Sequence, residues 1–136
     1  MTKAEIFSFM NANKVFFLAT CEGTQPRVRG LYLHKADENG IVFTTGKMRD
    51  LYKQLKANPA IELIFHKDNL AIRVTGIATE TDDLDIKNEI LEARPFMRPI
   101  VEKFGFEPMS VFYIKNGVAT PWTMETTMAP KTYINL

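Results

Sequence analysis

The sequence has almost no cysteine and almost no excess of charge of either sign. Its single cysteine, Cys21, excludes an internal disulfide bond and is typical of a reducing compartment. The formal net charge is only +1, whereas generic nucleic-acid-binding proteins carry a large basic excess. We therefore expect a cytoplasmic protein that does not bind nucleic acid, in which any basic chemistry is local.

Long apolar runs are also missing. No stretch approaches the roughly 20 residues that a membrane-spanning helix needs. The first ten residues, MTKAEIFSFM, lack the basic region, long apolar run and small-residue cleavage site of a secretory signal. We therefore expect the chain to have neither a signal peptide nor a membrane-spanning helix.

Several catalytic and cofactor motifs are absent. Cys21, His34 and His66 lie far apart without the spacing of metal ligands, so we expect no metal site and interpret both histidines as ordinary strand-end residues. The stretch from Gly40 to Met48 is no phosphate-binding P-loop, because it has one residue too many between its glycines and methionine follows the lysine. A G-x-G-x-x-G fingerprint and a nucleophile elbow are missing as well.

What is present is an aromatic-rich chain of single-domain size. Its 136 residues are 46% hydrophobic and include ten phenylalanines, which suits one core over residues 1–136. Short β-branched and aromatic runs between turn signals predict a mainly β, antiparallel domain of six or seven strands. We place these strands at 15–21, 27–35, 41–45, 60–66, 70–80, 110–115 and 118–124. Asn116-Gly117 is the dipeptide favoured in hairpin turns, so we expect the last two strands to form a hairpin.

Three helices are expected around these strands. Thr2 and Glu5 have the spacing of a capping box and predict a helix that ends near residues 11–13. A second helix, which stops at Asn58-Pro59, is predicted by the apolar stripe of Met48, Leu51, Tyr52 and Leu55. Thr81-Asp82-Asp83 is expected to cap a third helix that runs to about Ala93, with its acids where the helix dipole favours them. Three prolines, at positions 95, 99 and 108, are expected to break the chain beyond it.

The first predicted strand, residues 15–21 (VFFLATC), is apolar at successive positions. Successive side chains of a strand point to opposite faces, so both of its faces are apolar. Such a strand is expected to be covered on both sides.

Basic residues concentrate between Arg27 and Lys53. Arg27 and Arg29 alternate along one face of a predicted strand. Beyond them, the next strand and the helix that follows it contribute Thr44, Thr45, Lys47, Arg49 and Lys53. A helix N-terminus attracts anions, and arginines, hydroxyls and a lysine beside it would complete a phosphate site. The alternative interpretation is that these are solvated surface charges.

Three segments then resemble the pyridoxamine 5'-phosphate oxidase family, near its nitroimidazole-reductase-like branch. They are QPRVRG from Gln25 to Gly30, IVFTTGK from Ile41 to Lys47, and LYKQLKANPAIEL from Leu51 to Leu63. The match lies in their order and spacing and covers most of the chain. The resemblance implies a six-stranded antiparallel split β-barrel with flanking helices, a homodimer, and flavin mononucleotide (FMN) at the dimer interface.

The resemblance also implies roles for individual residues. The segment Arg27, Val28, Arg29 and Gly30 would lie along the flavin, and Thr44 and Thr45 would contact it. Lys47 and Lys53 would hold its phosphate. Many relatives have a Ser-Arg-Lys cluster where this chain has Lys47-Met48-Arg49-Asp50, so Arg49 is a third candidate. Trp122 would lie near the flavin or, alternatively, in the core or interface. The second face of strand 15–21 would meet a helix or the partner subunit.

The activity implied by the resemblance is that of an FMN-dependent oxidoreductase on an unidentified small molecule, with NAD(P)H as a possible donor. Strict pyridoxamine phosphate oxidation is not expected, because residues 130–136 offer only Lys131 as a cation for a substrate phosphate. The alternatives are a non-catalytic flavin-binding or redox-sensing module and a haem-binding relative, for which only His34 or His66 would readily serve as axial ligand. A deazaflavin in place of FMN is a further alternative.

Overall fold

Nine strands form one antiparallel sheet in the computed structural model, which describes residues 1–136. The strands are β1 Val15–Glu22, β2 Gln25–Tyr32, β3 Lys35–Asp37, β4 Gly40–Gly46, β5 Ala60–Lys67, β6 Leu70–Thr81, β7 Met109–Ile114, β8 Val118–Trp122 and β9 Ile134–Asn135. The helices are α1 Lys3–Ala12, α2 Asp50–Ala57, α3 Leu84–Ala93 and α4 Arg98–Phe104, with 3₁₀ turns at Pro95–Met97 and Met124–Thr126. The mainly β, antiparallel prediction is confirmed.

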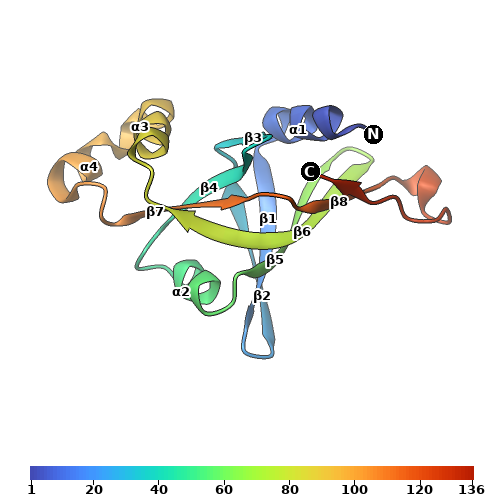
Figure 1. Ribbon diagram of the computed structural model, residues 1–136, viewed down its shortest axis with the longest axis horizontal. Coiled ribbons are helices and arrows are strands. Elements are labelled where there is room, and N and C mark those ends of the chain that lie inside the picture. Colours follow the sequence, from blue (N-terminus) through green and yellow to red (C-terminus); the bar gives the residue numbers. More distant parts are fainter.

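The strand order is β2-β1-β5-β6-β7-β4-β3, and β8 pairs with both β6 and β9. Since β2 and β3 are end strands, the sheet curves without closing (Figure 1). The expected count of six or seven strands was too low, because the short strands β3 and β9, with three and two residues, were not predicted as separate strands. The predicted strand 27–35 also divides, since β2 ends at Tyr32 and β3 begins at Lys35.

The predicted hairpin of the last two strands was wrong, because β7 and β8 do not pair with each other. Both pair with the long strand β6: β8 with its residues 71–75 and β7 with its residues 78–81 (Figure 1). Gly76 and Gly117 lie where the two partners separate. A Cβ atom on Gly76 would lie 2.6 Å from Cγ2 of Ile114, and one on Gly117 would lie 2.7 Å from Cγ1 of Val74. Glycine therefore permits the close packing at this split.

The helices follow the predicted capping signals closely. The Thr2 hydroxyl accepts the Glu5 N–H at 3.1 Å, and the Glu5 carboxylate accepts the Thr2 N–H at 2.7 Å, which confirms the capping box. Asp83 is the N-cap of α3, and its carboxylate accepts the Asp85 N–H at 2.9 Å. The helix α4 was not expected, because its prolines were interpreted as breaks. Pro99 instead occupies the first turn of α4, where a missing N–H costs no hydrogen bond.

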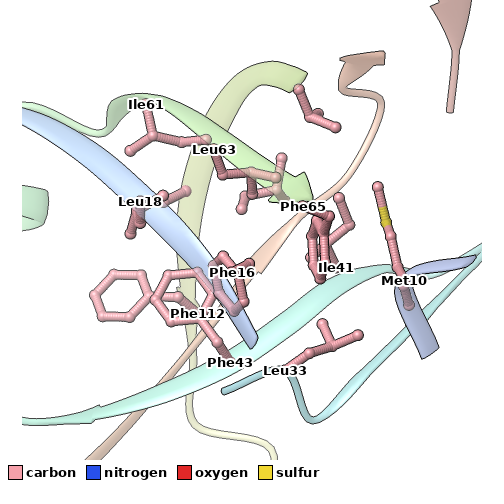
Figure 2. Packing of buried hydrophobic residues seen from close by; sticks show 14 of the residues in the cluster. Met10, Phe16, Leu18, Leu33, Ile41, Phe43, Ile61, Leu63, Phe65 and Phe112 are labelled. Carbon is pink, nitrogen blue, oxygen red and sulfur yellow. The ribbon is translucent and has the colours of Figure 1, made fainter. Parts of the chain in front are cut away.

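Stacked phenylalanine rings fill the centre of the sheet (Figure 2). The ring of Phe16 on β1 stacks on Phe65 of β5 at 5.0 Å between centroids, and Phe43 of β4 stacks on Phe112 of β7 at 5.8 Å. All four side chains are fully buried. This core ties together strands from both ends of the sheet and holds the β1–β2 hairpin in place.

One face of the β1–β2 hairpin is not covered by the rest of the chain. Phe16 and Leu18 point into the core, whereas Val15 is 57% and Phe17 47% exposed. The register places Val15 opposite Tyr32 and Phe17 opposite Gly30, so this apolar face continues onto β2. The expectation that β1 is covered on both sides is therefore not met within a single chain. We call this surface, made of residues 15, 17, 28, 30 and 32, the outer face.

His34 leads to a prediction about stability and pH. Burial lowers the pKa of its imidazole, and this outweighs the opposing effect of the hydrogen bond with Glu89 at 3.1 Å. Below a pH of about 6.5, the unfolded chain therefore binds a proton that the folded protein resists, so stability falls as the pH decreases. Urea unfolding at pH 7.5 and 5.5 measures the loss. His34→Gln should reduce this loss of stability. His66→Gln, at an exposed histidine, is the control and should leave the loss as large as in the wild type. Equal losses in all three proteins would contradict the prediction.

None of the helices combines the length and the hydrophobicity that a membrane span requires.

Candidate functional site

The two arginines of β2 point toward the interior side of the sheet. Register pairs Arg29 with Leu18 and Arg27 with Thr20, both of which are buried. Side chains directly opposite each other in a strand pair share a face. Val28 and Gly30, which alternate with the arginines, therefore belong to the outer face. The sequence prediction that Arg27 and Arg29 share one face of a strand is confirmed.

These arginines line a cleft of about 700 Å³ between the β1–β2 hairpin and the start of α2. This volume lies within the roughly 300–1,000 Å³ of typical ligand pockets. Three arginines and two carboxylates give the cleft one excess positive charge. The lining consists of Glu22, Arg27, Val28, Arg29, Gly30, Leu31, Thr45, Met48, Arg49, Asp50, Leu51 and Gln54.

Arg29 is fixed in the wall of the cleft by hydrogen bonds. It donates to the Thr20 hydroxyl at 2.8 Å, to the Leu18 carbonyl at 3.2 Å and to the Gln54 side-chain carbonyl. The Thr20 hydroxyl in turn donates to the same Gln54 oxygen at 2.6 Å. Burial, followed by repulsion from Arg27, lowers the pKa of the Arg29 guanidinium. Arg29 is thus a rigid positive charge that joins β2 to α2.

Glu22 and Arg27 form an exposed ion pair at the tip of the hairpin. One carboxylate oxygen of Glu22 lies 3.1 Å from the Arg27 guanidinium, and the other accepts the Gln54 amide at 3.2 Å. These bonds, the one from Arg27 first, lower the pKa of Glu22. The ion pair connects Arg27 to the same network that fixes Arg29.

Two lining groups have no partner within the chain. Arg49 is the exposed N-cap residue of α2, and its side chain forms neither a capping hydrogen bond nor an ion pair. Thr45, on β4, is only 8% exposed, yet its hydroxyl makes no hydrogen bond to the protein. A guanidinium and a hydroxyl that face a cleft beside a helix N-terminus are suited to bind an anionic oxygen.

Four residues of the predicted site lie outside the cleft lining. The hydroxyl of Thr44 donates to the Ser110 carbonyl at 2.8 Å. Lys47 forms an ion pair with Glu107 at 3.3 Å, and this hydrogen bond raises the pKa of its ammonium. Lys53 is exposed on α2, and Trp122 lines a separate pocket at the end of β8. The cleft thus brings together Arg27, Val28, Arg29, Gly30, Thr45 and Arg49.

Sequence reasoning missed Glu22, Gln54 and Met48 as lining residues. Gln54 stands three residues after Leu51 and next to Leu55, within the buried arc of α2, and it is only 5% exposed. A polar residue at such a position signals a buried hydrogen-bond network. Met48 was expected in the apolar stripe of this helix, but α2 begins only at Asp50 and Met48 is 81% exposed.

Several solved structures have a similar fold. A NimC/NimA family protein from Clostridium acetobutylicum is 26% identical, with a TM-score of 0.80 over 98% of this chain and 92% of that one. An FAD-binding protein from Mesorhizobium loti is 18% identical, with a TM-score of 0.63 over 90% and 96%. HutZ, a heme storage protein from Vibrio cholerae, is 16% identical, with a TM-score of 0.60 over 85% and 90%.

Sequence comparisons agree with the fold. No curated protein sequence matches the chain. A family model described as pyridoxamine 5'-phosphate oxidase matches residues 2–116, which include the whole arginine-lined cleft. The resemblance recognised in the sequence is confirmed: the chain belongs to the pyridoxamine 5'-phosphate oxidase family.

Proposed function

We propose that the protein is a homodimeric flavoprotein that binds FMN in the arginine-lined cleft and acts as an oxidoreductase on a small molecule. The observation that carries the proposal is the cleft of about 700 Å³, in which unpartnered Arg49 and Thr45 face the same space as Arg27 and Arg29. The FAD-binding protein from Mesorhizobium loti, whose solved structure has a similar fold, supports a flavin as the ligand.

The phosphate of FMN would be held by Arg27, Arg49 and the Thr45 hydroxyl. Charge-assisted hydrogen bonds to arginine replace the water that a phosphate loses on binding. Arg49 suits this role better than the lysines, because Arg49 lines the cleft and has no partner, whereas Lys47 and Lys53 both lie outside the lining. Arg29, fixed by its bonds to β1 and α2, would contribute its charge without moving.

The flavin ring would lie along β2. As an end strand, β2 leaves backbone N–H and C=O groups free on its outer edge, and these groups can bond the ring's polar edge. Gly30 has no side chain, so a planar group can approach the backbone of β2 closely at this position. Val28 supplies apolar contact beside it.

A second copy of the chain would cover the outer face. Val15, Val28 and Tyr32 are each more than half exposed and lie on neighbouring strands. Soluble monomers rarely expose such contiguous apolar surfaces. Symmetric pairing of the same patch on two copies is the commonest way to bury one. The cleft would then lie at the edge of the interface.

The redox chemistry would come from the flavin, while the protein binds and orients it. The only carboxylates in the cleft, Glu22 and Asp50, are exposed, so this chain does not present a buried acid–base pair beside the arginines. The proposal therefore predicts electron or hydride transfer, with NAD(P)H as the donor to test first.

The deciding experiment is the absorption spectrum of the purified protein, together with the mass of the chromophore released by heat. We expect a flavin band, the mass of FMN and bleaching when NADH or NADPH is added without oxygen. A bound flavin that neither nicotinamide reduces would instead indicate a non-catalytic or sensing module. The mass of a deazaflavin, or a colourless protein that does not take up FMN, would contradict the cofactor.

Haem is the second candidate, because a haem storage protein shares the fold. The two histidines argue against it in this chain. The His34 side chain is only 7% exposed and bonded to Glu89, and His66 lies on β5; neither lines the cleft. A Soret band in place of the flavin band would reverse this choice.

A further inference from the structure

The arginine-lined cleft contains a carboxylate that already engages one of its arginines. Glu22 is the last residue of β1, near the tip of the β1–β2 hairpin, which extends beyond the rest of the sheet (Figure 1). One oxygen of Glu22 accepts a hydrogen bond from the Arg27 guanidinium at 3.1 Å, and both side chains line the cleft. Each side chain is about half exposed, so packing does not lock the pair together.

The register of the hairpin and a buried amide hold this carboxylate in the cleft. Thr20 lies opposite Arg27, so Glu22, two residues further along β1, is the diagonal neighbour of Arg27 on the same face. The second oxygen of Glu22 accepts the Gln54 amide N–H at 3.2 Å, and Gln54 is itself buried on α2. The Glu22 carboxylate therefore points toward α2, across the space that the arginines line.

Glu22 differs in this respect from the other acid of the lining. Asp50 lies in the first turn of α2, where the helix dipole favours an acid, and it forms no ion pair with a lining arginine. The hydrogen bonds from Arg27 and then Gln54 lower the pKa of Glu22, so its carboxylate is charged at neutral pH. Glu22 is thus the one anion of this chain that competes for an arginine of the cleft.

A phosphate that binds Arg27 has to contend with this carboxylate. To take the N–H group that Glu22 holds, the phosphate must open the ion pair; if it takes other N–H groups, two anions stay close together and repel each other. Both effects subtract from the free energy that the phosphate gains. Because an exposed ion pair contributes little to stability, Glu22 weakens the binding of a phosphate without preventing it.

We propose that Glu22 is a built-in competitor for the phosphate of the flavin: it pairs with Arg27 before the ligand binds and pairs with it again when the ligand leaves. The inference rests on the proposed function, because Arg27 must be a phosphate ligand for the competition to occur. Glu22 then sets how strongly the cleft distinguishes a phosphorylated flavin from an unphosphorylated one. It also keeps the bound flavin exchangeable.

The test is Glu22→Gln, which removes the charge but keeps an oxygen that can accept the Gln54 amide. FMN and riboflavin, which lacks the phosphate, are titrated into the flavin-free full-length protein, and the quenching of flavin fluorescence measures both affinities. We expect the variant to bind FMN about three- to tenfold more tightly than the wild type, and riboflavin within about twofold. The gain should appear as slower release of FMN in stopped-flow displacement.

Two controls separate competition from a general effect of charge. Glu38→Gln also removes an exposed carboxylate from an ion pair, with Lys3 at 2.8 Å, but it lies outside the cleft lining and should leave FMN affinity unchanged. Introduced together with Arg27→Met, Glu22→Gln should lose most of its effect, because the residue for which it competes is missing.

The outcomes distinguish this inference from the proposed function. Unchanged or weaker FMN binding by Glu22→Gln would overturn the competition, and weaker binding would show that Glu22 positions Arg27 for the phosphate. Equal tightening of riboflavin, or the same gain in the presence of Arg27→Met, would overturn it as well. If neither the wild type nor the variant binds FMN, the proposed function itself is wrong, and the competition with it.

Discussion

Exchange of Arg27 and Arg49 for methionine together is expected to weaken FMN binding by about 100-fold or more. Each guanidinium would supply charge-assisted hydrogen bonds to the phosphate, and methionine keeps the length of the side chain but not its charge. Neither side chain is buried, so the fold should tolerate the exchange. Titration of the flavin-free protein, followed by the quenching of FMN fluorescence, measures the affinity.

The matched control exchanges Lys47 and Lys53 for methionine. These residues are the phosphate ligands implied by the family resemblance, but they lie outside the cleft lining. We expect the control variant to lose less than about threefold in affinity for FMN, because neither ammonium lines the cleft and charges that do not contact the phosphate are screened by salt. If the lysine pair loses affinity strongly and the arginine pair does not, the phosphate assignment from the cleft is wrong and Lys47 and Lys53 are the phosphate ligands.

Phe17→Asp is expected to convert the proposed homodimer into a monomer. The Phe17 side chain is 47% exposed in one chain, so aspartate there is solvated in the monomer. In a dimer joined through the outer face, the same carboxylate would be buried, at a cost on the order of several kcal/mol. Sedimentation velocity measures the change in mass. Because the cleft lies beside this face, we also expect weaker flavin binding.

Leu84→Asp provides the control for this dimer experiment. Leu84 is 61% exposed at the first turn of α3, where an acidic residue suits the helix dipole. This variant should remain dimeric. A wild-type protein that sediments as a flavin-loaded monomer, or a Phe17→Asp variant that stays a dimer, would show that the outer face is not the interface.

Local signals were sufficient for most elements of the fold. The capping box of Thr2 and Glu5 and the acidic cap at Asp83 were correct because capping depends on residues three positions apart or fewer. The prediction for β7 and β8 failed because pairing is decided by distant partners. Asn116 does adopt a positive φ of 59°, as a tight turn requires. The strands on either side of it nevertheless continue onto different halves of β6.

In the candidate site, too, local patterns were predicted correctly and contacts between distant segments were not. Alternation along β2 was enough to place Arg27 and Arg29 on one face. It was not enough to choose among the cations of the following segment, because that choice depends on where α2 begins and on Glu107, sixty residues away from Lys47. Gln54, on α2, was overlooked for a related reason. Its hydrogen-bond partners Thr20, Glu22 and Arg29 come from the β1–β2 hairpin, which is distant in the sequence.

The sequence by itself determined that this is a mainly β, antiparallel domain of the pyridoxamine 5'-phosphate oxidase family, with arginines alternating along one strand. These properties follow from the period of the side chains and from short-range capping and turn preferences. Only the tertiary structure decided that Arg49 faces the cleft while Lys47 is paired elsewhere, and that β6 is shared by β7 and β8. Such outcomes depend on contacts between residues far apart in the chain, which neither periodicity nor local spacing encodes.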